Sequence, residues 1–276
     1  MQQIVKIKML KLGVLHTALN TTGFETLKNK EIDVKSIAFD TFQEGINALR
    51  AGDIDIISMP FKDTPIDLPA GIVIAALSER IDARQCLVFL KNTATDFTQF
   101  SELENPKILT FNDLNSKLIQ HILPSSSTET QDLMPSDGIE QVNKNAYQAC
   151  ILPLEAVKMM DLDPSIWHVQ AFSPREFTPE IGQGVTCFMV DEEDLPTRRL
   201  LQNRVHQRAV AILTNVERSL KKLLSDTPIA AYCERDKGGN YHFSAAILME
   251  NSVKTVRLSQ STVFELAERA KEQLMN

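Results

Sequence analysis

Cysteine is scarce in this sequence, and its placement excludes several kinds of site. The 276 residues contain four cysteines, Cys86, Cys150, Cys187 and Cys233, with no Cys-x-x-Cys pair and no cluster of cysteine with histidine. Such spacing is not that of a structural zinc site, so we expect reduced, buried thiols. Apolar runs are short as well. Lysines interrupt them near the N-terminus, which predicts neither a secretory signal nor a membrane span and makes the cytoplasm the expected compartment.

Positive charge is the second shortage. The chain has 29 lysine and arginine residues against 36 aspartate and glutamate residues, which gives a formal net charge of −7. That balance argues against nucleic acid as a partner and does not favour the binding of anionic substrates. What is present is ordinary for a globular protein: 43% hydrophobic residues, 24% charged residues and enough length for two or three domains.

The hydrophobic pattern alternates between strands and helices, which predicts parallel strand pairing and an α/β fold. The expected strands are residues 4–15, 32–39, 107–110, 149–152, 185–190, 229–233, 241–249 and 253–258. The expected helices are residues 17–29, 44–50, 114–122, 154–160 and 198–224. A last helix is expected to start at Thr262, in a capping box that Glu265 completes. Residues 124–137, rich in serine and proline, are expected to form a loop.

One stretch concentrates the polar residues that suggest a site. Residues 54–59 and 71–77 have the pattern of buried strands, because they are short, rich in β-branched side chains and bounded by proline and glycine. The loop between them places Lys62 and Asp63 side by side at the C-terminal end of a strand. In open α/β sheets, ligands bind at that edge.

This stretch resembles the porphobilinogen deaminase (hydroxymethylbilane synthase) family, in which the same region reads Asp-Ile-Ala-Val-His-Ser-Met-Lys-Asp-Val-Pro and then Glu-Arg-x-Asp-Pro-Arg. The matching residues are Asp55, Lys62, Asp63, Pro65, Glu79, Arg80, Asp82 and Arg84. Residues 179–184 read Pro-Glu-Ile-Gly-Gln-Gly and resemble the family's Pro-x-x-Gly-Gln-Gly, where the chain returns to its first domain. The two glycines suit a close backbone approach or a hinge.

The resemblance implies a fold of three domains. Two are α/β domains like those of type II periplasmic binding proteins, and the third is a C-terminal αβββα domain. The first domain is expected at residues 1–91 and 183–198, the second at 92–182 and the third at 199–276. Asp63 is expected to face a cleft between the first two domains.

In the family, an aspartate handles the pyrrole nitrogens of a chain that grows on a dipyrromethane cofactor tethered to one cysteine. By position, the resemblance gives Asp63 that catalytic role, with Lys62 beside it. The alternative is a solvated ion pair, or an aspartate that caps the strand end.

Further residues are expected to contact substrate in the cleft. The resemblance implies this role for Arg80, Arg84, Gly182, Gln183 and Gly184. For the two arginines, a structural ion-pair network with the neighbouring acids is the other interpretation.

The cofactor anchor of the family is missing. The family closes its long helix with a Glu-Arg pair and continues through a Gly-Gly-Cys turn to Pro-Ile. Here the Glu-Arg pair at residues 217–218 and the Pro-Ile pair at 228–229 are kept, but residues 221–227 contain no cysteine. Cys233 lies in the pattern of a buried strand, where burial disfavours the reactive thiolate. We therefore expect no dipyrromethane cofactor, and we assign no metal site.

The arginines that hold carboxylates are missing too. The family's Gly-Thr-Ser-Ser-Leu-Arg-Arg corresponds to Thr-Phe-Asn-Asp-Leu-Asn-Ser at residues 110–116, and the turn at residues 15–19 lacks the family's arginine. Residues 92–174 contain eleven acids, four lysines and no arginine. Arginine binds carboxylates bidentately and stays charged, so a domain with this balance should repel an anionic oligopyrrole. The five histidines lack metal spacing, and none is assigned a catalytic role.

Two functions from different classes follow. The first is a porphobilinogen deaminase-like protein of tetrapyrrole biosynthesis, a transferase by ancestry with weak or no activity and so a pseudoenzyme. The second is a non-catalytic binding or regulatory protein that uses the interdomain cleft for a small ligand or an enzyme of the tetrapyrrole pathway. In either case we expect a monomer that binds neither nucleic acid nor membranes.

Overall fold

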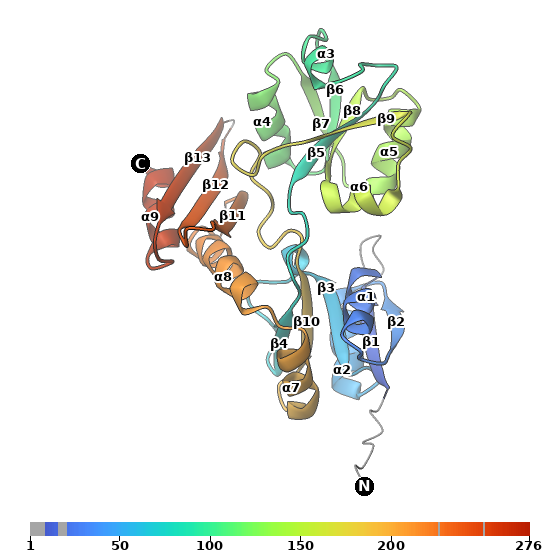
Figure 1. The fold of residues 1–276 in the computed structure, drawn as a ribbon, viewed down its shortest axis with the longest axis vertical. Helices are drawn as coiled ribbons and strands as arrows, with labels where there is room; N and C mark the ends of the chain where they lie inside the picture. Colours follow the sequence, from blue (N-terminus) through green and yellow to red (C-terminus); the bar gives the residue numbers. More distant parts are fainter. Residues whose placement is uncertain (1–8, 16–20, 226, 251) are drawn as a thin grey trace. The chain divides into compact units, whose positions relative to one another are not determined.

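A computed structural model describes residues 9–15, 21–225, 227–250 and 252–276 of the chain, which is coloured along its length in Figure 1. By its packing the chain forms two compact units, Met1–Arg80 with Gly184–Ala211 and Ile81–Gln183 with Ile212–Asn276. Each unit is described by itself below.

The described elements follow the chain in this order. The strands are β1 (Leu10–Leu15), β2 (Val34–Phe39), β3 (Ile56–Pro60), β4 (Ile72–Leu77), β5 (Gln85–Leu90), β6 (Lys107–Thr110), β7 (Ser127–Thr130), β8 (Ala149–Pro153), β9 (Trp167–Ala171), β10 (Thr186–Asp191), β11 (Ile229–Arg235), β12 (Tyr241–Met249) and β13 (Ser252–Gln260). The helices are α1 (Thr21–Asn29), α2 (Phe42–Ala51), the short 3₁₀ turn η1 (Phe61–Asp63), α3 (Phe97–Ser101), α4 (Asp113–Ile122), α5 (Pro135–Asn143), α6 (Leu154–Met160), α7 (Leu195–Arg204), α8 (Arg208–Leu223) and α9 (Leu266–Met275).

The first unit is built on a five-stranded sheet with the order β2-β1-β3-β10-β4. β1 pairs in parallel with β2 and β3, whereas β10 runs antiparallel to β3 and β4. Helix α1 packs closely against this sheet through Gly23, where a Cβ atom would come within 1.9 Å of the Ser58 hydroxyl oxygen. A glycine is therefore required at that position for α1 to lie against β3.

The second unit contains a five-stranded sheet with the order β7-β6-β8-β5-β9. β6 pairs in parallel with β7 and β8, whereas β5 runs antiparallel to β8 and β9. The residues of β5, which were expected in the first domain, pair here with β8 and β9. The two sheets share one strand order. In each, the strands β2-β1-β3 or β7-β6-β8 are followed by an antiparallel strand, β10 or β5, which the chain forms just after it crosses from the other unit. The last strand is β4 or β9.

The same unit holds a three-stranded antiparallel sheet with the order β11-β12-β13. One face of this sheet packs in a core with α8 and α9 that includes Leu220, Phe243 and Leu274. Alternate small residues of β11 and β12, Ala230 and Ala246, belong instead to the core of the preceding five-stranded sheet. The alternation of strand side chains thus joins the three-stranded sheet to two of the cores of its unit.

The predicted loop over residues 124–137 is wrong, because β7 occupies Ser127–Thr130 and α5 begins at Pro135. The strand is polar and is held by hydrogen bonds: the Thr128 hydroxyl contacts the Ser116 hydroxyl at 2.6 Å and accepts from Gln120 Nε2 at 2.9 Å. A search for apolar alternation misses such a strand, and a proline at the first helical position is a helix start as well as a loop signal.

The predicted single helix over residues 198–224 is also wrong, because α7 ends at Arg204 and α8 begins at Arg208. The break is fixed by the end of β4, where Leu77 donates its N–H to His206 Nδ1 at 3.3 Å and accepts from the Gln207 N–H at 3.0 Å. Neither hydrogen bond can be predicted from the local periodicity of the sequence.

The predicted capping box at the last helix is not formed. α9 begins at Leu266, and Glu265 before it has a left-handed conformation, with φ of 53° and no side-chain cap. The carbonyl groups of Thr262 and Phe264 instead accept from Gln260 Nε2, both at 2.8 Å. Gln260, which precedes the predicted capping box, therefore stabilises this turn instead.

Candidate functional site

The Lys62–Asp63 pair lies where the sequence predicted it, directly after β3. Phe61 fixes the turn η1, because its side chain is buried and its N–H donates to the Val185 carbonyl at 2.8 Å. Lys62 Nζ lies 3.2 Å from Asp63 Oδ1, and the Asp63 side chain is 42% exposed. The turn thus presents one carboxylate with an ammonium group beside it. The carboxylate can accept a hydrogen bond from an N–H donor.

The Gly-Gln-Gly motif is a braced turn. Gly182 and Gly184 have φ values of 75° and 76°, in the left-handed region that favours glycine. The Gly182 N–H donates to the fully buried Glu217 carboxylate at 2.9 Å. Gln183, 1% exposed, accepts through Oε1 from Gln85 Nε2 at 3.0 Å and from the Glu180 N–H at 3.1 Å. The motif therefore anchors its own loop in the second unit.

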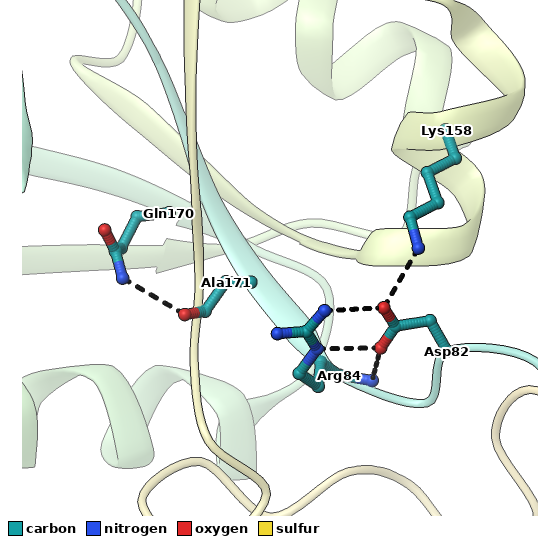
Figure 2. A network of polar contacts seen from close by, with 5 residues as sticks. All are labelled: Asp82, Arg84, Lys158, Gln170 and Ala171. Atoms are coloured by element: carbon teal, nitrogen blue, oxygen red, sulfur yellow. Dashed lines mark hydrogen bonds and ion pairs between the residues drawn. The ribbon is translucent and has the colours of Figure 1, made fainter.

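Arg84 forms an ion pair with Asp82, two residues before it in the sequence. Its Nε and Nη2 atoms donate to the two oxygens of Asp82 at 2.9 and 2.7 Å, and Lys158 Nζ lies 3.0 Å from the same carboxylate (Figure 2). The hydrogen bond from the Arg84 side chain, against the opposing effect of burial, lowers the pKa of Asp82 well below its ordinary value. The guanidinium fork that would bind a ligand carboxylate is thus already occupied.

This pair gives a pH-dependent contribution to stability. Because the folded pKa of Asp82 is lowered, the pair stabilises the fold above the unfolded pKa of about 4 and loses this contribution as the pH falls towards the folded pKa. Asp82→Asn is expected to lower the free energy of unfolding by about 1–2 kcal/mol at pH 7, near the low end for charged hydrogen bonds because Arg84 is 45% exposed. Urea titrations at pH 7 and pH 3 measure this difference.

The matched control for that titration is Asp132→Asn, which changes an exposed aspartate of the same unit. The control should change the free energy of unfolding by less than about 0.5 kcal/mol at either pH. A gap between the Asp82→Asn variant and the parent that persists unchanged at pH 3 would contradict the electrostatic origin of the effect.

The predicted site residues divide between the two units. Lys62, Asp63, Arg80 and Gly184 belong to the first unit, while Arg84, Gly182 and Gln183 belong to the second. The structure brings together Lys62 with Asp63, and the remaining contacts of Arg84, Gly182 and Gln183 are those given above. That Asp63 faces a cleft shared with the second domain stays a prediction, as do the three domain boundaries. The turn at residues 16–19 lies outside the described residues.

All four cysteines are buried. Cys86, Cys150, Cys187 and Cys233 each have 0% exposure. Burial raises the pKa of the Cys86 thiol to about 12 and that of Cys150 well above its usual range. Cys233 sits within β11, and its backbone N–H donates to Glu217 Oε1 at 2.9 Å. Burial disfavours the reactive thiolate at these positions.

The second unit contains a cavity of about 430 Å³ that the sequence did not predict. Its lining residues are Asn112, Asp113, Leu114, Asn115, Thr130, Glu180, Lys221, Pro228, Ile229 and Ala230. Residues 112–115 and Lys221, which lie in two segments where the family pattern is altered, thus line one cavity together with the kept Pro-Ile pair at residues 228–229. Among the described residues around it, neither cysteine nor arginine lines the cavity.

The C-terminal sheet carries a serine–histidine–aspartate contact that sequence reasoning missed. His242 Nδ1 lies 2.7 Å from the Ser259 hydroxyl, and His242 Nε2 lies 2.9 Å from Asp236 Oδ2. The hydrogen bond from His242 lowers the pKa of Asp236 to about 2. Only the strand register pairs His242 with Ser259. Asp236 also accepts from the Asn240 N–H at 2.9 Å, so the contact ties the hairpin turn to β13 at the surface.

Two other kinds of site receive no support from the part of the chain that the structure describes. Its helices are too short or too polar to cross a membrane. Its histidine, cysteine, aspartate and glutamate side chains form no group of three or more that could hold a metal ion.

The shared strand order of the two five-stranded sheets, with one antiparallel strand entering from the other unit, defines a type II periplasmic-binding-protein-like α/β fold, extended here by a C-terminal three-stranded sheet with helices. The sequence model of one protein family, described as "Porphobilinogen deaminase, dipyromethane cofactor binding domain", matches residues 4–199. The chain belongs to the porphobilinogen deaminase family, as its motifs predicted.

Relatives named porphobilinogen deaminase match most of the chain. The protein from Streptococcus sanguinis is 28% identical over 265 residues, which cover 94% of this chain and 80% of that protein. The protein from Acetivibrio thermocellus is 27% identical and covers 83% of this chain and 72% of its own length. Among solved structures, an ancestral cationic amino acid solute binding protein is 15% identical, with a TM-score of 0.47 over 71% of this chain and 87% of that one.

Proposed function

We propose that this chain is a porphobilinogen deaminase-family protein of tetrapyrrole biosynthesis that carries no tethered dipyrromethane and has weak or no deaminase activity. One observation carries the proposal: all four thiols of the chain are fully buried, and the cavity that residues 112–115 and Lys221 help to line offers neither a cysteine nor an arginine among its described residues. Thioether attachment needs a thiolate that reaches the ligand, and each thiol of the chain is buried. In this proposal the protein is a monomer of the cytoplasm.

The charges around the cavity support the same proposal. A dipyrromethane with acetate and propionate side chains is a polyanion, whereas the lining contains Asp113 and Glu180 against the single cation Lys221. Arginine forks normally compensate such ligands, and their bidentate geometry is not reproduced by one lysine. Arg84, the arginine that the family resemblance offers in the same unit, is bonded to Asp82. The Lys62–Asp63 pair alone can position one pyrrole but cannot anchor a growing chain.

A second candidate function is supported by the cavity itself. A volume of about 430 Å³ lies in the range of small-molecule sites, and two segments distant in sequence converge on it. A non-catalytic binding or regulatory protein of the same pathway would keep such a cavity after losing the catalytic anchor. Binding of a small ligand without turnover distinguishes this function from that of a weak enzyme.

The proposal is tested with 4-dimethylaminobenzaldehyde in acid, which colours pyrroles. Protein purified from cells that make tetrapyrroles, and protein incubated with porphobilinogen, are denatured, freed of small molecules and treated with the reagent. We expect no colour above that of an unrelated protein. Colour that stays with the denatured polypeptide would overturn the proposal, because it would show that a pyrrole is covalently attached.

A further inference from the structure

A cluster of polar side chains lies on one face of the three-stranded C-terminal sheet. Alternate side chains of β12 and β13, among them Phe243 and Val256, point into the core that the sheet forms with α8 and α9. His242 and Ser259 therefore lie on the opposite face, where the strand register places them directly across from each other. The two strands lie side by side in Figure 1, and Ser259 is exposed.

The hydrogen bonds of His242 decide which ring nitrogen carries the proton. The hydrogen bond from His242 lowers the pKa of Asp236 to about 2, so Asp236 is a carboxylate at neutral pH and can only accept. His242 Nε2, 2.9 Å from Asp236 Oδ2, is therefore the donor. Nδ1 of the neutral ring then keeps its lone pair and accepts from the Ser259 hydroxyl at 2.7 Å.

The carboxylate of Asp236 is itself held in place by the hairpin turn. Its Oδ1 accepts from the Asn240 N–H at 2.9 Å, and the Gly239 N–H donates to the Asp236 carbonyl at 3.1 Å. A fixed carboxylate thus orients an imidazole base, and the base contacts a serine hydroxyl. This arrangement activates a serine as a nucleophile, and it is recognised by its geometry rather than by the order of the residues in the sequence.

A cation lies beside the serine. Arg257 precedes Ser259 by two residues, so both side chains lie on the same face of β13, about 7 Å apart along the strand. Arg257 Nη2 donates to the Arg175 carbonyl, and the other N–H groups of this guanidinium have no acceptor among the described residues. Such donors can stabilise the negative charge that develops on a carbonyl oxygen when an acyl group is transferred.

We propose that Ser259 is a nucleophile that accepts the acyl group of a small ester, with His242 as its general base and Asp236 as the residue that positions the base. Ser259 Oγ bonds to the ester carbonyl carbon while its proton passes to His242 Nδ1. The bond to the alcohol oxygen then breaks, and the alcohol takes that proton. Water repeats these steps on the acyl-serine, which releases the acid and restores the hydroxyl.

The substrate class follows from the exposure of the site. Ser259 is exposed, and the side chains of His242 and Asp236 are 23% and 37% exposed. A site this open to solvent suits a small activated ester rather than a large ligand that needs a deep pocket. The proposal uses none of the residues assigned to the deaminase site, so it stands whether or not the chain has deaminase activity.

The test is covalent labelling of the full chain with a fluorophosphonate, a reagent that reacts with activated serine hydroxyls. Peptide mass analysis compares the labelling rate of Ser259 with that of Ser252, an exposed serine of the same strand whose hydroxyl donates to the Met249 carbonyl. We expect Ser259 to react at least about tenfold faster in the folded protein, below the range typical of a general base because the site is open. Equal rates at the two serines would overturn the proposal.

Variants separate activation of the hydroxyl from its mere exposure. His242→Gln and Asp236→Asn should each slow the labelling of Ser259 at least about tenfold, while Ser252→Ala leaves it unchanged. Circular dichroism confirms that each variant is folded. With p-nitrophenyl acetate, the parent should release p-nitrophenolate faster than Ser259→Ala and carry an acetyl group on Ser259. A folded His242→Gln protein that is labelled at the parent rate would contradict the proposal, because the histidine would then not act as the base.

Discussion

Purified protein incubated with porphobilinogen is expected to release no measurable hydroxymethylbilane, assayed as uroporphyrin after oxidation. Loss of one bidentate arginine from a carboxylate costs about 2–5 kcal/mol when the partner charge is left buried. Residues 92–174 contain no arginine at all, so several such contacts are missing together. Two of them, even without full additivity, would lower affinity by at least roughly a hundredfold at 1.4 kcal/mol per tenfold.

The control for this assay is Asp63→Ala, which removes the exposed carboxylate of η1 without disturbing the buried Phe61 beside it. The parent and the variant should give the same background signal. If the parent clearly produces uroporphyrin and the variant does not, the chain binds the substrate carboxylates through other residues. The expectation of no deaminase activity would then be wrong.

Glu217→Ala is expected to give the largest loss of stability of any single substitution considered. Glu217 is fully buried and accepts the N–H of Gly182 and the N–H of Cys233, both at 2.9 Å. Removing the carboxylate leaves both donors buried without this acceptor, and a hydrogen bond to a charged group contributes about 1.5–3 kcal/mol. We expect a loss of about 3–5 kcal/mol, a large share of the stability of an ordinary protein.

Urea unfolding of three proteins measures this effect. Glu217→Gln keeps one acceptor oxygen and should fall between the parent and Glu217→Ala. Glu272→Gln, on the exposed side of α9, should match the parent within about 0.5 kcal/mol. If Glu217→Ala lowers the free energy of unfolding by less than about 1 kcal/mol, the two N–H groups find other acceptors. The hydrogen bonds to Glu217 would then contribute little to stability.

Much of the fold was predictable because strong local signals agreed with tertiary packing. The sequence predicted β12 and α6 with their observed bounds, and it predicted β3 and β4 within two residues at each end. It failed where long-range hydrogen bonds override local pattern. Polar β7 is stabilised by Ser116 and Gln120, and the break between α7 and α8 is fixed by Leu77.

The candidate site was predictable only where one segment carries it. Adjacent residues and a strand end placed Lys62 and Asp63 together, and a missing turn predicts the loss of the cofactor anchor. The bond between Gly182 and Glu217 joins residues whose motifs were both recognised, but no local pattern states that they touch. The cavity was missed for the same reason, since Asn115 and Lys221 come from helices far apart in the sequence.

The absence of a covalent cofactor is tested most directly by the intact mass of the purified protein. Expression in cells that make porphobilinogen gives the chain every opportunity to acquire a pyrrole. We expect the mass of the unmodified polypeptide, both as purified and after incubation with porphobilinogen. A mass higher by two linked pyrrole units, mapped by peptide analysis to Cys233 or another cysteine, would contradict the account.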